Sequence, residues 1–248
     1  MILKSTREIA GAGTFRNINA GNSPIAEAFR YSMCVVMNDS TALQPSARDC
    51  VMSSLPVRKL TPEEYLEIER QAEFKSEFYR GEMFAMSGAG RAHNLIANNI
   101  GGEARSRLRG RPCEVYGSDM RARVSTTGPY TYPDATIACD KPQFVDDRGD
   151  TLLTPKVLFE VLSETTEKYD RGAKSNQYRQ IESLQEYVLV SQSEPHVEVF
   201  QRCLDGKWLF SEARELLASI TTESLGVTLP LSEIYLRVEF PDSVAAAV

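Results

Sequence analysis

The stretch Val157-Leu158-Phe159-Glu160-Val161-Leu162 decides the fold. A short apolar run of this kind predicts a β-strand that is buried on both faces. An ionised Glu160 in such a strand is unfavourable unless a metal ion, a lysine or arginine, or a proton compensates its charge. Asp134 raises the same question, because it lies near the start of a second core strand predicted for residues 132–139. Two such acids with a lysine nearby would form a site for a hard divalent cation.

The segments on either side of this stretch predict a sheet with helices packed against it. Thr61 can cap a helix that begins at Pro62, because acidic residues fill the first turn. Apolar patterning predicts two short strands within 78–86 that turn at Gly81, further strands at 114–125, 186–191, 196–202 and 208–212, and helices at 92–109 and 168–181. This order predicts an α/β (α+β) fold with a mixed central sheet flanked by helices.

Composition limits the class of protein. The chain has 248 residues, of which 42% are hydrophobic and 25% charged, as expected for one globular domain with a tail. Apolar runs such as Val188-Leu189-Val190 are too short to cross a bilayer, so we expect no membrane partner. The net charge of -6 is unevenly distributed, with seven basic against four acidic residues in 1–59. The acidic remainder does not favour a nonspecific polyanion binder, although a nucleic-acid enzyme needs only local positive charge.

The two ends of the chain differ from its centre. Residues 1–51 have no sustained helical or alternating pattern, which predicts a disordered extension or an over-long gene start. Met52 would then open a domain that spans residues 52–240, followed by a flexible tail at 241–248.

Cysteine and histidine usage narrows the chemistry. The five cysteines are scattered and form no CxxC pair, which argues against a disulfide framework and a cysteine-zinc site and favours a reducing cytoplasm. The only histidines are His93 and His196, and we interpret His196 as structural. A metal would therefore be held mainly by carboxylates, which favours Mg²⁺ or Mn²⁺ over zinc.

Several motifs between residues 58 and 203 carry a resemblance to a known family. They are Leu60-Thr61-Pro62-Glu63-Glu64-Tyr65-Leu66, Glu77 through Gly81-Glu82, His93-Asn94, Tyr132-Pro133-Asp134, Phe159-Glu160-Val161-Leu162-Ser163, and Asp170 through Lys174 to Tyr178. In order and spacing this set resembles the Uma2 family of endonucleases (domain of unknown function 820), within the PD-(D/E)xK nuclease superfamily.

The resemblance implies a restriction-endonuclease-like core and a set of site residues. Asp134 and Glu160 would bind Mg²⁺ or Mn²⁺, and the backbone carbonyl of Val161 would complete the coordination. The superfamily's usual lysine, two positions after the acid, is replaced here by Leu162. Its role would pass to Lys174 on the next helix. The alternative interpretation of Lys174 is a solvated lysine beside Asp170, one helical turn earlier.

Two further residues would support the metal site. Glu77 resembles the acid that the first helix of such nucleases offers to the metal, and His93 could donate to a phosphate or relay a proton. The alternatives are an exposed helix-end charge for Glu77 and a histidine that makes only structural hydrogen bonds at a helix start.

Substrate contacts are predicted from a local excess of arginine. Residues 91–123 contain seven arginines and three acids, so Arg91, Arg121 and Arg123 could follow a phosphate backbone. Tyr178 is spaced to share a helical face with Lys174 and is predicted to bind substrate as well. The alternative is an ordinary charged surface.

The function predicted from these residues is Mg²⁺-dependent hydrolysis of DNA phosphodiester bonds by an endonuclease. The alternative is a catalytically inactive nuclease-fold module that binds DNA or protein. A homodimer is a further hypothesis, because cutting both strands of a duplex usually needs two sites.

Overall fold

The computed structural model of the protein describes residues 58–240. The predicted extension at 1–51, the proposed start at Met52 and the predicted tail at 241–248 lie outside the described residues. Within 58–240, no helix has both the length and the apolar character that a membrane span requires.

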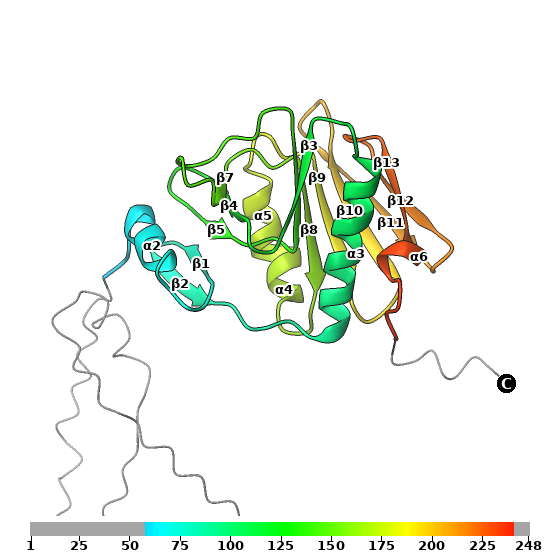
Figure 1. Ribbon diagram of the computed structural model, residues 1–248, viewed down its shortest axis with the longest axis horizontal. Helices are drawn as coiled ribbons and strands as arrows, with labels where there is room; N and C mark the ends of the chain where they lie inside the picture. The colour runs from blue at the N-terminus through cyan, green and yellow to red at the C-terminus, as the bar shows by residue number, and fades with distance from the viewer. Residues whose placement is uncertain (1–57, 241–248) are drawn as a thin grey trace, which may run out of the picture. The chain divides into compact units, whose positions relative to one another are not determined.

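The central element is a six-stranded mixed sheet (Figure 1). Its strands, in spatial order, are β11 (Trp208–Arg214), β10 (His196–Arg202), β9 (Glu186–Ser191), β8 (Val157–Leu162), β6 (Ala135–Cys139) and β3 (Cys113–Gly117). Strands β8 and β9 are parallel, and the other neighbours are antiparallel. The predicted antiparallel pairing of 186–191 with 196–202 is confirmed.

Both faces of β8 are buried, as its apolar run predicts. Val157, Phe159 and Val161 pack in the core beneath helix α3 (Arg91–Arg107). Leu158 and Leu162 pack in a second core on the other face. Because side chains alternate along a strand, Glu160 points to this second face.

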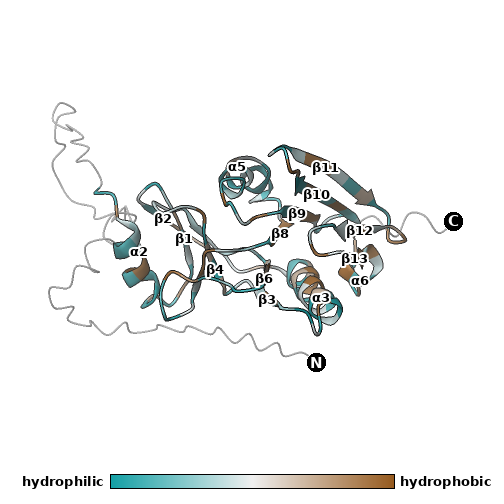
Figure 2. Cartoon of the chain, turned by 90° about the horizontal axis from the view of Figure 1, so that it is seen from above, coloured by the Kyte–Doolittle hydropathy of each residue, from teal (hydrophilic) through white to brown (hydrophobic). Residues whose placement is uncertain are grey.

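The helices cover the two faces separately (Figure 2). Helix α3, the short helix α6 (Leu231–Ile234) and the hairpin of β12 (Ser219–Thr222) and β13 (Val227–Pro230) lie on one side of the sheet. The other side carries one helical segment made of α4 (Glu167–Tyr169), the π-helical turn η1 (Asp170–Lys174) and α5 (Ser175–Tyr178).

A second sheet adjoins the first. It contains β2 (Glu82–Ala85), β1 (Ser76–Tyr79), β5 (Tyr130–Thr131), β4 (Arg121–Arg123) and β7 (Thr151–Leu152), in that spatial order. Helix α2 (Pro62–Glu69) begins with the capping box that the sequence predicts, in which Thr61 and Glu64 bond each other's backbone amides. Tyr65 of α2 packs with Phe78 and Tyr130 to form a small core of this sheet.

Three sequence predictions need correction. The strand predicted at 114–125 is two strands, β3 and β4, which belong to different sheets because a turn separates them at residues 118–120. The helix predicted at 168–181 is the composite α4–η1–α5 segment. Strands β12 and β13 and helix α6 were not predicted at all.

The expectation against disulfides is wrong for one pair. Cys113 and Cys139 form a disulfide bond, because they are directly opposite each other on the antiparallel strands β3 and β6. Their separation of 26 residues in the sequence hides this proximity. Cys203 is a free thiol.

Candidate active site

Lys174 lies at the centre of a buried cluster of carboxylates. Its Nζ atom is 2.8 Å from Oε1 of Glu160, 3.1 Å from Oε1 of Glu77 and 3.6 Å from Oδ1 of Asp170. The lysine side chain is only 6% exposed, and those of Glu160 and Asp170 are equally buried. A solvated lysine is therefore excluded, and the reach of Lys174 from the helix back to β8 agrees with the sequence prediction.

The fold brings this cluster together from three elements. Glu160 faces the α4–η1–α5 side of β8, Lys174 and Asp170 belong to η1, and Glu77 lies on β1 of the second sheet. Glu77 is thus a strand residue and not the helix-end acid that the sequence suggests.

Tyr178 holds Glu160 in place. Its hydroxyl donates a hydrogen bond to Oε1 of Glu160 at 2.7 Å and lies 2.9 Å from Oγ1 of Thr131. Tyr178 is fully buried, so the expectation that it touches substrate is not supported. Tyr178 and Lys174 lie on one helical face, as the spacing predicts, but only Lys174 lines the cavity described below, whereas Tyr178 is in the core.

Asp134 contacts the residue that follows Glu160 on β8. Its Oδ2 accepts a hydrogen bond from the backbone N–H of Val161 at 2.7 Å and is 3.3 Å from Nε2 of His93. His93 lies in the first turn of α3, which covers one face of the sheet, whereas the lysine cluster lies on the other face. Asp134 therefore lies between a residue from each face. Burial alone would lower the pKa of His93, but the hydrogen bond and charge of Asp134 outweigh it and raise the pKa.

The electrostatics of the cluster are dominated by burial. It raises the pKa of Glu160 well above its ordinary value and raises the pKa of Asp170, with Lys174 acting in the opposite direction. Burial favours neutral Lys174, but Glu160 and the other negative groups raise its pKa. Four carboxyl groups therefore surround one lysine and one histidine, so acidic side chains outnumber basic ones in the cluster.

These groups share one cavity of about 850 Å³. All five residues predicted to be catalytic line it, namely Glu77, His93, Asp134, Glu160 and Lys174. Val161 lines it as well. The fold thus brings residues from five separate segments of the sequence to one place.

Comparison with known proteins agrees with this arrangement. Residues 62–232 match the family Uma2, described as "Putative restriction endonuclease". The chain belongs to the Uma2 family. The resemblance stated from the sequence motifs is thereby confirmed.

Relatives of this Uma2 protein include two from Synechocystis sp. One, "Uncharacterized protein slr1290", is 33% identical over 188 residues, which cover 75% of this chain and 97% of the relative. Another, "Uncharacterized protein sll1609", is 36% identical over 153 residues, or 62% of this chain and 86% of the relative.

A solved structure supports the fold class. A crystal structure from Anabaena variabilis, described as "a putative nuclease belonging to DUF820", superposes with a TM-score of 0.59 and 16% sequence identity. The match covers 71% of this chain and 97% of the other. The nuclease-like mixed α+β fold predicted for the Uma2 protein is confirmed.

The three predicted phosphate-binding arginines lie outside the cavity. Arg121 is buried and bonds Thr151 at 2.9 Å and Tyr132 at 2.7 Å, so its guanidinium cannot reach DNA without breaking structural contacts. Arg91 is exposed, and Arg123 is half-buried on β4 opposite Tyr130. The expectation for Arg121 is therefore corrected, because its charge stabilises the second sheet.

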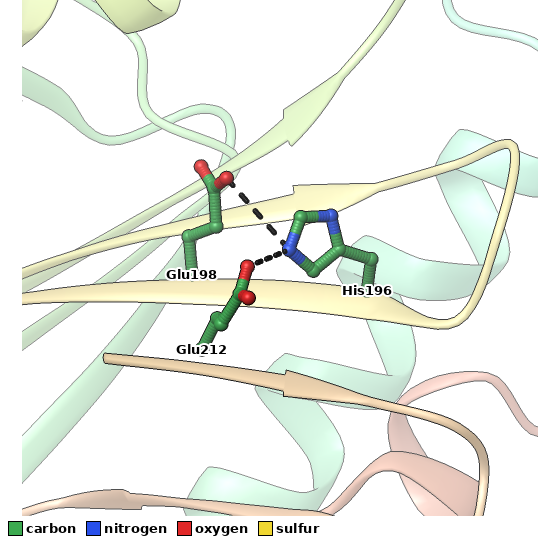
Figure 3. Close-up of side chains that lie close together, drawn as sticks. All are labelled: His196, Glu198 and Glu212. Carbon is green, nitrogen blue, oxygen red and sulfur yellow. Dashed lines mark hydrogen bonds and ion pairs between the residues drawn. The ribbon is translucent and has the colours of Figure 1, made fainter. Parts of the chain in front are cut away.

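A separate histidine–carboxylate cluster lies on β10 and β11 (Figure 3). Nε2 of His196 is 2.9 Å from Oε2 of Glu212 and 3.7 Å from Oε1 of Glu198. Arg171 also pairs with Glu198, and Arg214 lies 3.2 Å from Glu212. Because each carboxylate already has a cationic partner, we interpret the cluster as an ion-pair network, in line with the structural role expected for His196.

Sequence reasoning missed the burial of Asp170. The sequence places this acid at the start of the motif that runs to Tyr178 and one turn before Lys174, but assigns it no role in the site, although Asp170 is 3% exposed. The four-residue spacing to Lys174 was the available signal, because such pairs meet on one helical face. Nothing in that spacing shows that the face is turned to the protein interior.

Proposed function

We propose that this protein is a metal-dependent endonuclease that hydrolyses phosphodiester bonds in DNA. The observation that carries the proposal is the contact of Lys174 with Glu160 and Glu77 in the cavity that also contains Asp134. This combination of two acids and a lysine is the one that the family resemblance implies, although the lysine comes from a helix.

The oxygen donors at the site are of the type that a hard divalent cation prefers, although within residues 58–240 only His196, Glu198 and Glu212 bring three ligand atoms within 4.8 Å of one another. Asp134, Glu160 and Glu77 offer carboxylate oxygens, and the backbone carbonyl of Val161 would add a neutral oxygen, which suits Mg²⁺ or Mn²⁺. A bound cation would also favour the ionised forms of Glu160 and Asp170, whose pKa values burial raises. When bound, such an ion supplies a more acidic water and neutralises charge on a phosphate.

The residues of the chain have separate tasks in this proposal. Lys174 holds a positive charge beside Glu160, where it can stabilise negative charge that develops on a phosphate oxygen. Tyr178 fixes the orientation of Glu160 by its hydrogen bond. His93 can hold or release a proton at Nε2, the atom that faces Asp134.

Cleavage of supercoiled plasmid DNA by the full chain tests the proposal. We expect Mg²⁺- or Mn²⁺-dependent nicking that falls at least about 100-fold in Asp134→Asn, Glu160→Gln and Lys174→Met. The matched control is Glu212→Gln, which removes a carboxylate outside the cavity and should cleave like the wild type. Equal cleavage by all variants would indicate a contaminating nuclease and overturn the proposal.

The alternative is a nuclease-fold module without turnover. Leu162, at the position of the usual lysine, favours it, whereas the position of Lys174 weakens that argument. Calorimetric titration with Mn²⁺ separates the two readings, because the module predicts DNA binding without metal binding. Homodimerisation stays a hypothesis that light scattering would test, and a cytoplasmic location stays one as well.

A further inference from the structure

The cavity has an aromatic wall in addition to its acidic centre. We define this wall as Phe74, Tyr79 and Phe84, which line the cavity together with the apolar Met86. Phe74 is 75% exposed and Phe84 is 49% exposed. Within residues 58–240, neither phenylalanine is part of a stacked or edge-on ring pair, unlike Phe78 and Tyr65.

The β1–β2 hairpin explains why the wall faces the site. Phe84 pairs directly with Glu77 across the two antiparallel strands, so their side chains lie on the same face of the hairpin. Tyr79 follows Glu77 by two residues and shares this face. Phe78 points to the opposite face, where it packs in the core with Tyr65.

Single exposed apolar residues are common and need no explanation. Here two exposed phenylalanines belong to one cavity, and one of them is the cross-strand neighbour of a carboxylate that contacts Lys174. The hairpin already has a core on its other face, so the exposure of Phe84 is not a missing part of that core. The wall is therefore a partly exposed apolar surface in the same cavity as the charged centre.

We propose that the aromatic wall stacks an unpaired nucleobase, which makes single-stranded or locally unpaired DNA the substrate class. This inference rests on the proposed function and deepens it. In a duplex the base faces are covered by their neighbours, so an enzyme can stack on a base only if the base is unpaired or flipped out. Stacking on aromatic side chains tolerates any sequence, because every base has a π-face.

Charge also favours a base at this wall. A neutral base avoids the repulsion that the carboxylates would exert on a second anionic group, and the phosphate of the same nucleotide would lie beside Lys174. Two cations lie near the wall: Lys75, which lines the cavity and pairs with Asp119 at 3.0 Å, and Arg80, whose guanidinium lies 5.0 Å from the ring of Tyr79. A nucleotide has both an aromatic base, which the wall would contact, and an anionic phosphate, which Lys174 would contact.

Binding of labelled oligonucleotides to the full chain tests the inference without turnover. Fluorescence anisotropy with Ca²⁺ in place of Mg²⁺ would compare a single strand with the matching duplex. We expect tighter binding of the single strand, and a loss of about 5- to 30-fold in Phe84→Ala that spares the duplex. The control is Phe210→Ala on β11, because Phe210 is also 49% exposed but lies outside the cavity.

A second readout reports stacking directly. The emission of 2-aminopurine placed in the single strand should be quenched by the wild type and recover in Phe84→Ala and Phe84→Leu, which retains an apolar side chain. Circular dichroism would show that each variant is folded. Equal affinities of Phe84→Ala and Phe210→Ala, or equal losses for single strand and duplex, would overturn the inference.

The two proposals fail in different ways. Loss of single-strand binding in Phe84→Ala without any cleavage by the wild type would support the aromatic wall and overturn the endonuclease. Cleavage that depends on Glu160 but is unaffected by Phe84→Ala on single strands would support the endonuclease and overturn the aromatic wall.

Discussion

The ammonium group of Lys174 lies 2.8 Å from Oε1 of Glu160, and both side chains are almost completely buried. The lysine comes from a π-helical turn and the glutamate from the central parallel strand pair. The absence of a lysine two positions after Glu160 in the sequence thus does not mean that Glu160 lacks a lysine neighbour in the fold.

This contact predicts a large effect on stability. Lys174→Met leaves Glu160 and its neighbouring carboxylates without their buried cation, which should lower the free energy of unfolding by about 3–5 kcal/mol. The double variant Lys174→Met/Glu160→Gln should recover part of this loss, because one uncompensated charge is removed. Urea denaturation at pH 7 measures both, and an unchanged midpoint for Lys174→Met would contradict the prediction.

The hydroxyl of Tyr178 makes a smaller and separable contribution. Tyr178→Phe removes the donor to Glu160 while it keeps the ring in the core, so we expect a loss of about 1 kcal/mol in unfolding free energy. If Glu160 acts in hydrolysis, kcat should also fall while KM changes little. Tyr116→Phe serves as the control, because it removes a tyrosine hydroxyl that bonds Glu114 outside the cavity. Equal losses in both variants would contradict the positioning role.

The raised pKa of His93 predicts a pH dependence with a definite sign. A histidine whose pKa is higher in the folded than in the unfolded state stabilises the fold fully below about pH 6.5 and loses this contribution as pH rises through the folded pKa. The difference in unfolding free energy between the wild type and His93→Gln should therefore shrink from pH 5.5 towards pH 8. Asp134→Asn should lower the His93 pKa measured by NMR titration, and an unchanged value would argue against their contact.

The disulfide between β3 and β6 can be checked without an activity. Non-reducing peptide mapping should find Cys113 joined to Cys139, and Cys139→Ser should destabilise the oxidised protein by about 3 kcal/mol. Cys203→Ser is the matched control, because Cys203 is a free thiol. Free thiols at all three positions in protein purified without reductant would contradict the pairing.

The functional residues that the sequence predicts best are those whose side-chain chemistry conflicts with that of their neighbours in the chain. Glu160 stands out because a carboxylate interrupts an apolar strand, and the strand is found where the pattern places it. The helix start at Thr61 follows from local hydrogen-bonding rules, which depend on neighbouring residues alone. Both predictions use information within a few positions of the chain.

Other features depend on pairings between distant segments. Arg121 reads as an exposed cation on a strand, and only the packing of β4 against β5 and β7 shows that it is buried. The partners Cys113 and Cys139 are set by the register of β3 and β6. The pattern in 78–86 predicts two short strands but not which face of the hairpin is buried, and the exposure of Phe84 follows because Phe78 packs on the opposite face.

The π-helical turn at Asp170–Lys174 has an evolutionary consequence. Each residue of an ordinary helix advances the chain by about 100°, so adding or removing one residue in this turn would swing Lys174 and Tyr178 away from the strand. Substitutions within the segment can be tolerated during evolution, whereas insertions and deletions there should be selected against. An alignment of active homologues should therefore be free of gaps across these positions, even where the surrounding loops vary in size.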